Sequence, residues 1–442
     1  MKTKNMLNLS RRNFLRVGAA GAGALALGAL DQGVAPLSAK LAKAAPLPNH
    51  KRLVVINMLG GNDWLNTLIP TTGSVASIYQ SRRPNIAFQP GQGLSMTGGP
   101  TVPDFQMHPA MTNLQNLWNQ GDVAFVTKVG YPSQNLSHFV SEDIWSYGAR
   151  SGIASLSGLA PGWVARYGNA YSTSPMGLVS IGVGRRLDFE GATSNPFLVS
   201  SVSSFRYDID YHYSRNHELR ADVIQSILGM QPATGAKGDI AAAAQSAYNA
   251  AAQMTVAISD YETYETTNTI QYPLRAGSTT SLTTMGSRLR DIALLIYGGF
   301  DTEVFYTGFG GFDTHSDQAA RHTDLLTQLD EAIGVFQQDL TLQGVWNDTV
   351  IVVISEFGRR NYENGSDGTD HGHGGNMIVV GGPVNGGVHG DTLGDADLNA
   401  EYMPYSTDFR DVYRNLIQDH LGNAAAPLFP ETQPINSTLN VV

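Results

Sequence analysis

The chain has 442 residues, of which 42% are hydrophobic and 15% are charged, so it can bury a sizeable core and its composition argues against global disorder. It contains no cysteine, which excludes disulfides, thiolate nucleophiles and cysteine-based zinc sites and leaves His, Asp, Glu and Asn as possible metal ligands. The formal net charge of −10 argues against nucleic acid as a partner.

The first 44 residues predict an export signal that is not part of the fold. Arg11 and Arg12 precede a weakly apolar stretch, Val17–Leu30, and Ala42–Ala44 suits a cleavage site. The apolar stretch is too short and too rich in glycine for a membrane span. We therefore expect a twin-arginine signal over residues 1–44, export of the folded protein to the periplasm or the exterior, and no stable membrane span afterwards. The alternative is a basic, disordered arm.

The signal carries seven cations and one acid, so its removal takes the formal net charge from −10 to −16. An acidic mature surface strengthens the argument against nucleic acid as a partner. It leaves room for a local positive site that binds an anion.

The first two expected strands each end at a turn with polar, reactive groups. Arg52–Leu59 is a β-rich apolar run, and the Gly-Gly turn after it leads to Asp63. A helix over His108–Gly121 precedes the second strand, Asp122–Gly130. Ser137 and His138 then stand before a further helix that runs to Gly148. Asp63 could instead be a helix N-cap, and Ser137 could be an N-cap with His138 in the first turn.

The next third of the chain predicts flanking elements and a third strand with the same ending. The expected flanking elements are a strand over Met176–Gly182 and helices over Asp239–Ser259 and Ser287–Tyr297. A strand over Glu303–Phe309 is followed by Gly-Gly and then by Asp313 and His315. The long helix Asp317–Gly344 leads into the next strand, which predicts a βαβ unit.

The fourth strand, Thr349–Ser355, is followed by the densest group of ligand-type residues in the chain. The loop after it carries Glu356, Arg359, Arg360, Asp370, His371 and His373. A strand over Met377–Gly381 and a helix over Asp408–His420 complete the expected elements. Neither an internal repeat nor a credible linker is evident, so we expect a single α/β domain over residues 45–442.

The four loops are expected to meet because the carboxyl ends of parallel strands lie at one edge of a sheet. Mixed His and Asp ligands without cysteine suit Zn, Mn or Fe, and a Ser hydroxyl beside such an ion can act as a nucleophile. Two ions about 4 Å apart would suit displacement at phosphorus or sulfur. One ion with Arg359 or Arg360 clamping the anion is the simpler arrangement. The Gly/His loop could also be a hydrogen-bonded core turn, and Glu356–Arg359 a structural ion pair.

Five stretches carry a resemblance to a known family. GGNDWLNT, GYPSQNLSHFVSEDIW, GGFDTHSDQ, SEFGRR and TDHGHGG, in this order after a twin-arginine signal, resemble the exported bacterial family called domain of unknown function 1501. The resemblance covers essentially the mature chain. That family is grouped by fold with the alkaline phosphatase/sulfatase superfamily, which implies an alkaline-phosphatase-like α/β fold, with a mainly parallel central sheet, flanking helices and long Gly-rich loops.

The resemblance also implies one or two divalent metal ions and assigns candidate ligands. Residues that resemble the ligands of the superfamily, or could replace one, are Asp63, Asp313, His315, Glu356, Asp370, His371 and His373. Ser137 is the best match to the nucleophile. The sulfatase signature, Cys or Ser followed by Pro and Arg at fixed spacing, is absent, which argues against a formylglycine sulfatase.

The sequence therefore predicts an exported hydrolase of phosphate or sulfate esters that depends on Zn or Mn. The substrate would be a small anionic ester or a glycan-linked one, and Ser137, His138 and Arg359 would be catalytic. The alternative is a non-catalytic exported binding or assembly protein on the same fold.

Overall fold

The computed structural model describes residues 45–97, 104–148, 161–174, 176–184, 186–193, 196–202, 235–429 and 439–442. The predicted export signal lies outside these residues. Contacts divide the chain into two compact units, and the larger one, Leu47–Val199 with Ile270–Ala293 and Asp301–Val442, contains every candidate site residue. The smaller unit includes α8 (Ala236–Asn268), where Tyr264 packs on Tyr297 with ring centroids 4.6 Å apart. A single domain over residues 45–442 stays a prediction.

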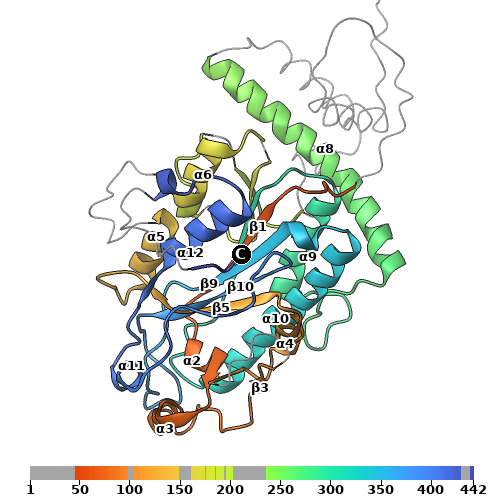
Figure 1. Ribbon diagram of the computed structural model, residues 1–442. Coiled ribbons are helices and arrows are strands. Elements are labelled where there is room, and N and C mark those ends of the chain that lie inside the picture. The colour runs from red at the N-terminus through yellow and green to blue at the C-terminus, as the bar shows by residue number, and fades with distance from the viewer. Residues whose placement is uncertain are drawn as a thin grey trace, which may run out of the picture. The chain divides into compact units, whose positions relative to one another are not determined.

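A nine-stranded sheet forms the centre of the larger unit (Figure 1). Its order is β11-β5-β10-β9-β1-β8-β6-β7, with β12 beside β5. The strands are β1 (Arg52–Leu59), β5 (Val123–Gly130), β6 (Leu178–Ile181), β7 (Phe197–Val199), β8 (Val304–Gly310), β9 (Thr349–Ile354), β10 (Gly375–Gly381), β11 (Gly387–His389) and β12 (Thr407–Asp408). All neighbouring strands pair in parallel except at β10, which is antiparallel to β5 and β9. The predicted mainly parallel α/β sheet is confirmed.

The central strands form because both of their faces are buried. In β1, Val54, Val55 and Ile56 are fully buried, and Val55 lies opposite Tyr306 of β8 and Val352 of β9. Parallel strands covered on both faces need such continuous apolar runs. Each buried Val or Ile side chain contributes about 1.5–3 kcal/mol relative to exposure.

Helices flank the sheet, and a small second sheet accompanies it. The helices of the larger unit are α2 (Trp64–Thr67), α3 (Gly73–Arg82), α4 (Thr112–Gln120), α5 (His138–Tyr147), α6 (Trp163–Tyr171), α10 (Gln318–Leu342), α11 (Asp395–Asn399) and α12 (Phe409–Asn415). Helix α12 continues as a π turn over Leu416–His420. Helix α9 (Thr284–Tyr297) begins in this unit and ends in the smaller one. The second, antiparallel sheet has the order β2-β4-β3, with β2 (Leu68–Pro70), β3 (Leu94–Ser95) and β4 (Phe105–Met107). None of the described helices combines the length and apolar character needed to cross a bilayer.

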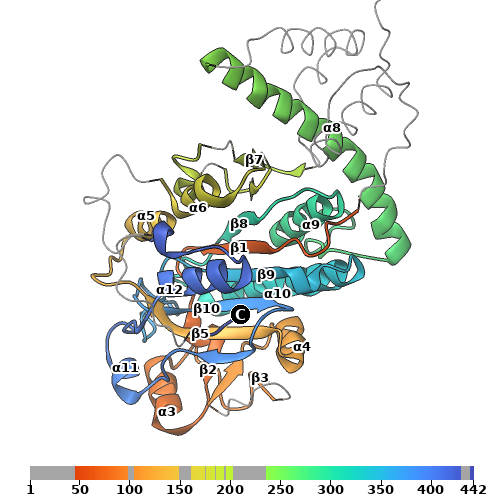
Figure 2. The same ribbon diagram turned by 45° about the horizontal axis from the view of Figure 1, so that its top comes forward.

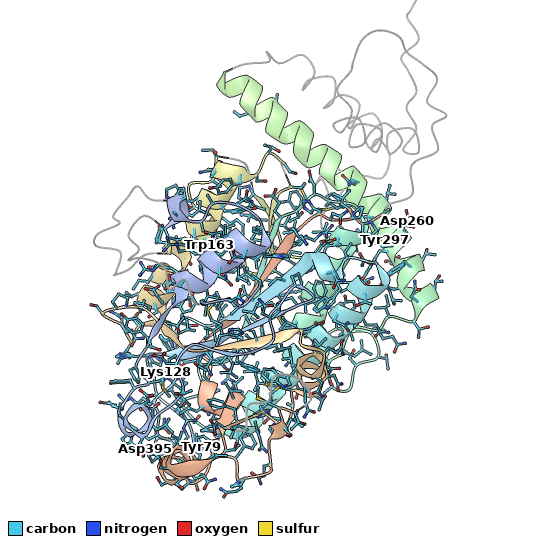
Figure 3. The ribbon with its side chains drawn as sticks, viewed as in Figure 1. Tyr79, Lys128, Trp163, Asp260, Tyr297 and Asp395 are labelled. Carbon is cyan, nitrogen blue, oxygen red and sulfur yellow. The ribbon has the colours of Figure 1, made fainter. Side chains whose placement is uncertain are left out.

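One hydrophobic core joins α5, α6 and α12 to the sheet (Figure 2). Trp163 of α6, which is labelled in Figure 3, packs on Tyr413 of α12 with ring centroids 4.6 Å apart. Both residues belong to the same hydrophobic cluster as Val55 and Val352. This packing fixes α5, whose first residue, His138, lies at the candidate site.

Stability is expected to fall between pH 6.5 and pH 4 because three histidines are buried in neutral form. Burial lowers the pKa of His108 to about 3 and the pKa of His322 and His420 to about 4. In the unfolded chain these groups bind protons near pH 6.5. The unfolded state then holds more protons in this window, so the free energy of unfolding decreases as the pH falls, by about 1.4 kcal/mol per pH unit for each such proton.

Urea unfolding at a series of pH values measures this effect. His420→Gln is the informative variant, because a Gln N–H can still donate to the Arg52 carbonyl, which His420 Nε2 does at 3.0 Å. The free energy of unfolding of this variant should change less steeply with pH than that of the wild type. The difference in slope should correspond to at most one proton. A free energy of unfolding that stays constant between pH 6.5 and pH 4 would contradict the prediction.

Candidate functional site

The topology brings four loops to one edge of the sheet. Strands β1, β5, β8 and β9 all end at this edge, and the antiparallel strand β10 begins there. Gly60, after β1, has a φ of +117°, and a Cβ on it would lie 2.4 Å from the backbone nitrogen of Asp313. Only glycine therefore lets the loops after β1 and β8 approach so closely.

Four side chains from three of these loops form what we call the His–Asp cluster: His138, Asp313, His315 and His371. The ligand-type atoms of His138, Asp313 and His371 lie within 4.8 Å of one another. His371 Nε2 lies 2.9 Å from His138 Nε2 and 3.3 Å from Asp313 Oδ1. His315 Nε2 lies 3.0 Å from both His371 Nε2 and Asp313 Oδ1. The side chains of Asp313 and His315 are 46% and 45% exposed, so a ligand can reach the cluster from solvent.

The far nitrogen of each imidazole in the cluster is hydrogen-bonded to an acceptor. His138 Nδ1 lies 2.7 Å from Glu356 Oε1, and His371 Nδ1 lies 2.7 Å from the Leu136 carbonyl oxygen. His315 Nδ1 lies 3.0 Å from Asp370 Oδ1. Since all three partners accept, we assign the proton to each Nδ1, which turns the Nε2 lone pairs toward the cluster. Such outer hydrogen bonds are typical of metal-binding histidines.

These groups fit a divalent cation. Two Nε2 lone pairs 2.9 Å apart repel each other unless a positive charge lies between them. Metal–ligand distances of about 2.0–2.2 Å in a tetrahedral site place neighbouring ligand atoms about 3.3 Å apart, close to the separations found here. Neutral imidazoles with one carboxylate suit Zn or Mn.

The electrostatics favour the protonation states that a metal needs at Asp313 and His371, but not at His138. Burial alone would raise the pKa of Asp313, but the hydrogen bond and charge of Arg359, with His138 and His315, lower it to about 2. Burial lowers the pKa of His371, and the charges of His138 and Arg359 lower it further. Burial also lowers the pKa of His138, but the hydrogen bond and charge of Glu356 outweigh it, so this pKa is raised. Metal binding would therefore compete with a proton at His138.

Glu356 and Asp370, predicted as ligands, are hydrogen-bonded to histidines of the cluster. Glu356 is 2% exposed, and its Oε1 accepts from the backbone nitrogen of Gly60 at 2.8 Å as well as from His138. Asp370 Oδ1 likewise accepts a hydrogen bond from His315 Nδ1. Both carboxylates are therefore placed to orient imidazoles rather than to contact an ion.

Asp63 and His373, also predicted as ligands, contact other groups. Asp63 is buried and forms an ion pair with Arg83, with Oδ2 and Nη1 2.6 Å apart. The His373 ring stacks on Tyr402 with centroids 4.4 Å apart. Because the guanidinium of Arg83 already supplies the positive charge that buried Asp63 requires, a second metal ion at Asp63 does not fit this arrangement.

Arg359 is not placed to clamp an anion, contrary to the prediction. Its side chain is fully buried, and its guanidinium donates to the carbonyl oxygens of Gly60, Gly61, Phe312 and Thr369 and to Asp313 Oδ1. The distance from Arg359 Nη2 to Asp313 Oδ1 is 2.6 Å. Arg359 therefore holds Asp313 and the surrounding loops in place.

Ser137 directly precedes the cluster residue His138 and stands at the N-cap of α5. Its side chain makes no capping hydrogen bond, so the alternative of an N-capping serine is supported by position only. Within the described ranges, no contact joins its hydroxyl to the His–Asp cluster. Its role as a nucleophile stays a prediction.

Comparisons with known proteins identify a family and distant structural likenesses. The model of the family described as "Protein of unknown function (DUF1501)" matches residues 50–422. No curated protein matches the chain.

Among solved structures, Ps i-CgsB in complex with k-i-k-neocarrahexaose shares 10% identity at a TM-score of 0.36, over 88% of this chain and 73% of that one. A protein in the alkaline phosphatase superfamily from Vibrio parahaemolyticus shares 10% identity at a TM-score of 0.33, over 93% of this chain and 75% of that one. A TAB5 alkaline phosphatase mutant with Mg bound shares 10% identity at a TM-score of 0.31, over 89% of this chain and 100% of that one. Likenesses this distant assign no substrate or residue role.

Proposed function

Since the chain belongs to the family described as protein of unknown function DUF1501, we propose its function from the site itself: a metal-dependent hydrolase of phosphate or sulfate esters. The observation that supports this proposal is the convergence of imidazole nitrogens and the Asp313 carboxylate, with His371 Nε2 within 2.9–3.3 Å of the other three groups. Such a donor set would hold one Zn or Mn ion. The proposal is for one ion because Asp63 is already neutralised by Arg83.

The roles proposed for the chain's own residues follow from their contacts. A divalent ion bound by the cluster would act as a Lewis acid on the ester. Glu356, Asp370 and the Leu136 carbonyl keep the imidazoles turned toward the ion, while Arg359 holds the Asp313 carboxylate. Ser137 is the proposed nucleophile, because its position at the N-terminus of α5 favours negative charge on its oxygen.

Export is a further part of the proposal. It rests on the twin-arginine pattern of residues 1–44, with Arg11 and Arg12 before an apolar stretch. Cell fractionation should find the mature protein in the periplasm or the medium. Replacing both arginines with lysine should leave the precursor in the cytoplasm, and unchanged export would contradict the proposal.

A second candidate is a non-catalytic exported binding or assembly protein on the same fold. It is favoured by the position of Arg359, whose buried guanidinium is occupied by protein acceptors, and by the lack of a described contact between Ser137 and the cluster.

The test combines metal analysis with an ester assay on the mature protein. Elemental analysis should find about one equivalent of a transition metal, and 4-nitrophenyl phosphate or sulfate should be hydrolysed only by the metal-loaded form. Asp313→Asn should lower this rate by more than about 100-fold without loss of the fold, because it weakens a ligand rather than the core. Metal-loaded protein that hydrolyses neither ester would support the second candidate. Protein that binds no metal would overturn the hydrolase proposal and would also support the second candidate.

A further inference from the structure

Gln318, the first residue of α10, is fully buried and its side chain joins three of the four loops that form the site. Its Nε2 donates to Asp63 Oδ2 in the loop after β1. Its Oε1 accepts from the Thr314 hydroxyl at 3.0 Å, in the loop after β8, and from the Thr369 hydroxyl at 2.6 Å, in the loop after β9. A single amide group therefore links these loops.

The buried ion pair between Asp63 and Arg83 determines which way this amide points. Asp63 Oδ2 accepts from Arg83 Nη1 at 2.6 Å as well as from Gln318 Nε2. An ionised carboxylate only accepts hydrogen bonds, so the NH2 group of Gln318 must face Asp63 and its Oε1 must face the two threonines. The opposite orientation would set two acceptors against each other, at a cost of about 1–3 kcal/mol for each buried group left unpaired.

The two threonines adjoin the cluster residues in the chain. Thr314 lies between Asp313 and His315, and Thr369 lies two residues before His371. The backbone nitrogen of Thr369 also donates to the Thr314 carbonyl oxygen at 3.1 Å. The two loops are therefore joined next to the atoms that would hold the ion. Since metal–ligand distances vary by only about 0.2 Å, a small displacement of one loop would weaken binding.

We propose that Gln318 is a positioning residue of the metal centre: it sets the separation of the loops after β8 and β9, and with it the affinity and the coordination geometry of the ion. The proposal rests on the proposed metal-dependent function. Glutamine suits this position because its amide offers two donors and an acceptor with two lone pairs. Asp63 then acts on the site through Gln318 rather than as a ligand.

Gln318→Met tests the proposal, because it removes the amide and keeps a long, unbranched side chain. The zinc affinity of the folded mature protein, measured by competition with a chelator, should fall by about 10- to 100-fold, the range typical of residues that orient metal ligands. The visible absorption spectrum of the Co(II)-loaded protein, which depends on coordination geometry, should also change. A role in stability alone would move neither quantity.

Thr369→Val is a milder variant that removes only the hydroxyl that donates to Gln318. It should lower the zinc affinity by a smaller factor than Gln318→Met. In the Gln318→Met background it should have little further effect, because the acceptor of this hydroxyl is already gone. A full, additive loss in that background would show that the hydroxyl does not act through Gln318.

Gln343→Met is the matched control at the other end of the same helix. Gln343 Nε2 donates to Asp339 Oδ1 at 2.8 Å and to the Ala293 carbonyl oxygen at 3.3 Å. This variant also loses amide hydrogen bonds, but it should keep the zinc affinity and the Co(II) spectrum of the wild type.

The outcomes separate this proposal from the one on which it rests. Wild-type zinc affinity and an unchanged Co(II) spectrum in Gln318→Met, or an equal loss in Gln343→Met, would overturn the positioning role and leave the metal centre standing. If Gln318→Met does not fold, an unchanged zinc affinity in Thr369→Val overturns the role. A wild-type protein that binds neither Zn(II) nor Co(II) would overturn the proposed metal centre and the role of Gln318 with it.

Discussion

His371→Ala is expected to remove the bound metal, with the metal content of the purified protein falling from about one equivalent to near zero. The Nε2 atom of His371 contacts all three other members of the cluster, at 2.9 Å for His138, 3.0 Å for His315 and 3.3 Å for Asp313. Loss of even an outer partner of a ligand typically costs 10- to 100-fold in metal affinity, so loss of this imidazole should cost more. Elemental analysis after dialysis, with metal titration of the apoprotein, measures the change.

His373→Ala provides the control, because the chain offers a second imidazole two residues away. His373 stacks on Tyr402, and among the described residues its ring makes no contact with the cluster, so its variant should retain the metal. Circular dichroism should show that both variants fold. Retention of metal in His371→Ala, or its loss in His373→Ala alone, would contradict the arrangement of the cluster.

The strands could be predicted closely because their cause is local. A parallel strand buried on both faces is an unbroken apolar run, and the predicted Arg52–Leu59 coincides with β1. The direction of β10 could not be predicted, since the same valines serve a parallel or an antiparallel strand. The predicted helix Asp239–Ser259 ends nine residues before α8, which ends at Asn268. The prediction followed the Ala-rich stretch, but the helix continues beyond that stretch.

The sequence indicated which loops meet, but not which atoms turn toward the centre of the cluster. Ligand-type residues at the ends of parallel strands pointed to Asp313, His315 and His371, and to His138 as a partner of Ser137. The acceptor at His371 Nδ1 is the backbone carbonyl of Leu136, a group that every residue has and that therefore leaves no trace in the sequence.

Asp63 illustrates the same limit for long-range pairing. Its partner, Arg83, lies 20 residues along the chain, beyond α2, β2 and α3, and no local pattern connects the two. The assignment of Asp63 as a ligand rested on its place after β1. Asp63 does follow β1 as predicted, but its carboxylate forms a buried ion pair with Arg83.

Arg359 and Arg360 are chemically identical neighbours, and the sequence offered no means of separating their roles. In the structure, the Arg359 guanidinium is buried and donates to four carbonyl oxygens and a carboxylate, whereas the Arg360 guanidinium lies over two tyrosine rings and beside Glu401. Substitution should therefore cost much more stability at Arg359 than at Arg360.

Arg359→Met is expected to lower the free energy of unfolding by about 3–5 kcal/mol, because removing one partner of a buried charged network leaves the others unpaired. The carbonyl oxygens of Gly60, Gly61 and Thr369 would lose the donor that Arg359 supplies, and each buried acceptor without a partner costs about 1–3 kcal/mol. Urea unfolding of the metal-free protein measures this loss, with Arg360→Gln as a control that should change by less than about 1 kcal/mol.

Metal-free protein is the right material for that comparison, because Arg359 also holds Asp313 and a bound ion would mix a loss of metal affinity with the loss of stability. If Arg359→Met were as stable as the wild type and only anion binding were lost, the predicted role as an anion clamp would be right and the structural role wrong. A large loss of stability is the result that the contacts require, because a fully buried guanidinium whose acceptors are the loops themselves is part of the fold that assembles the site.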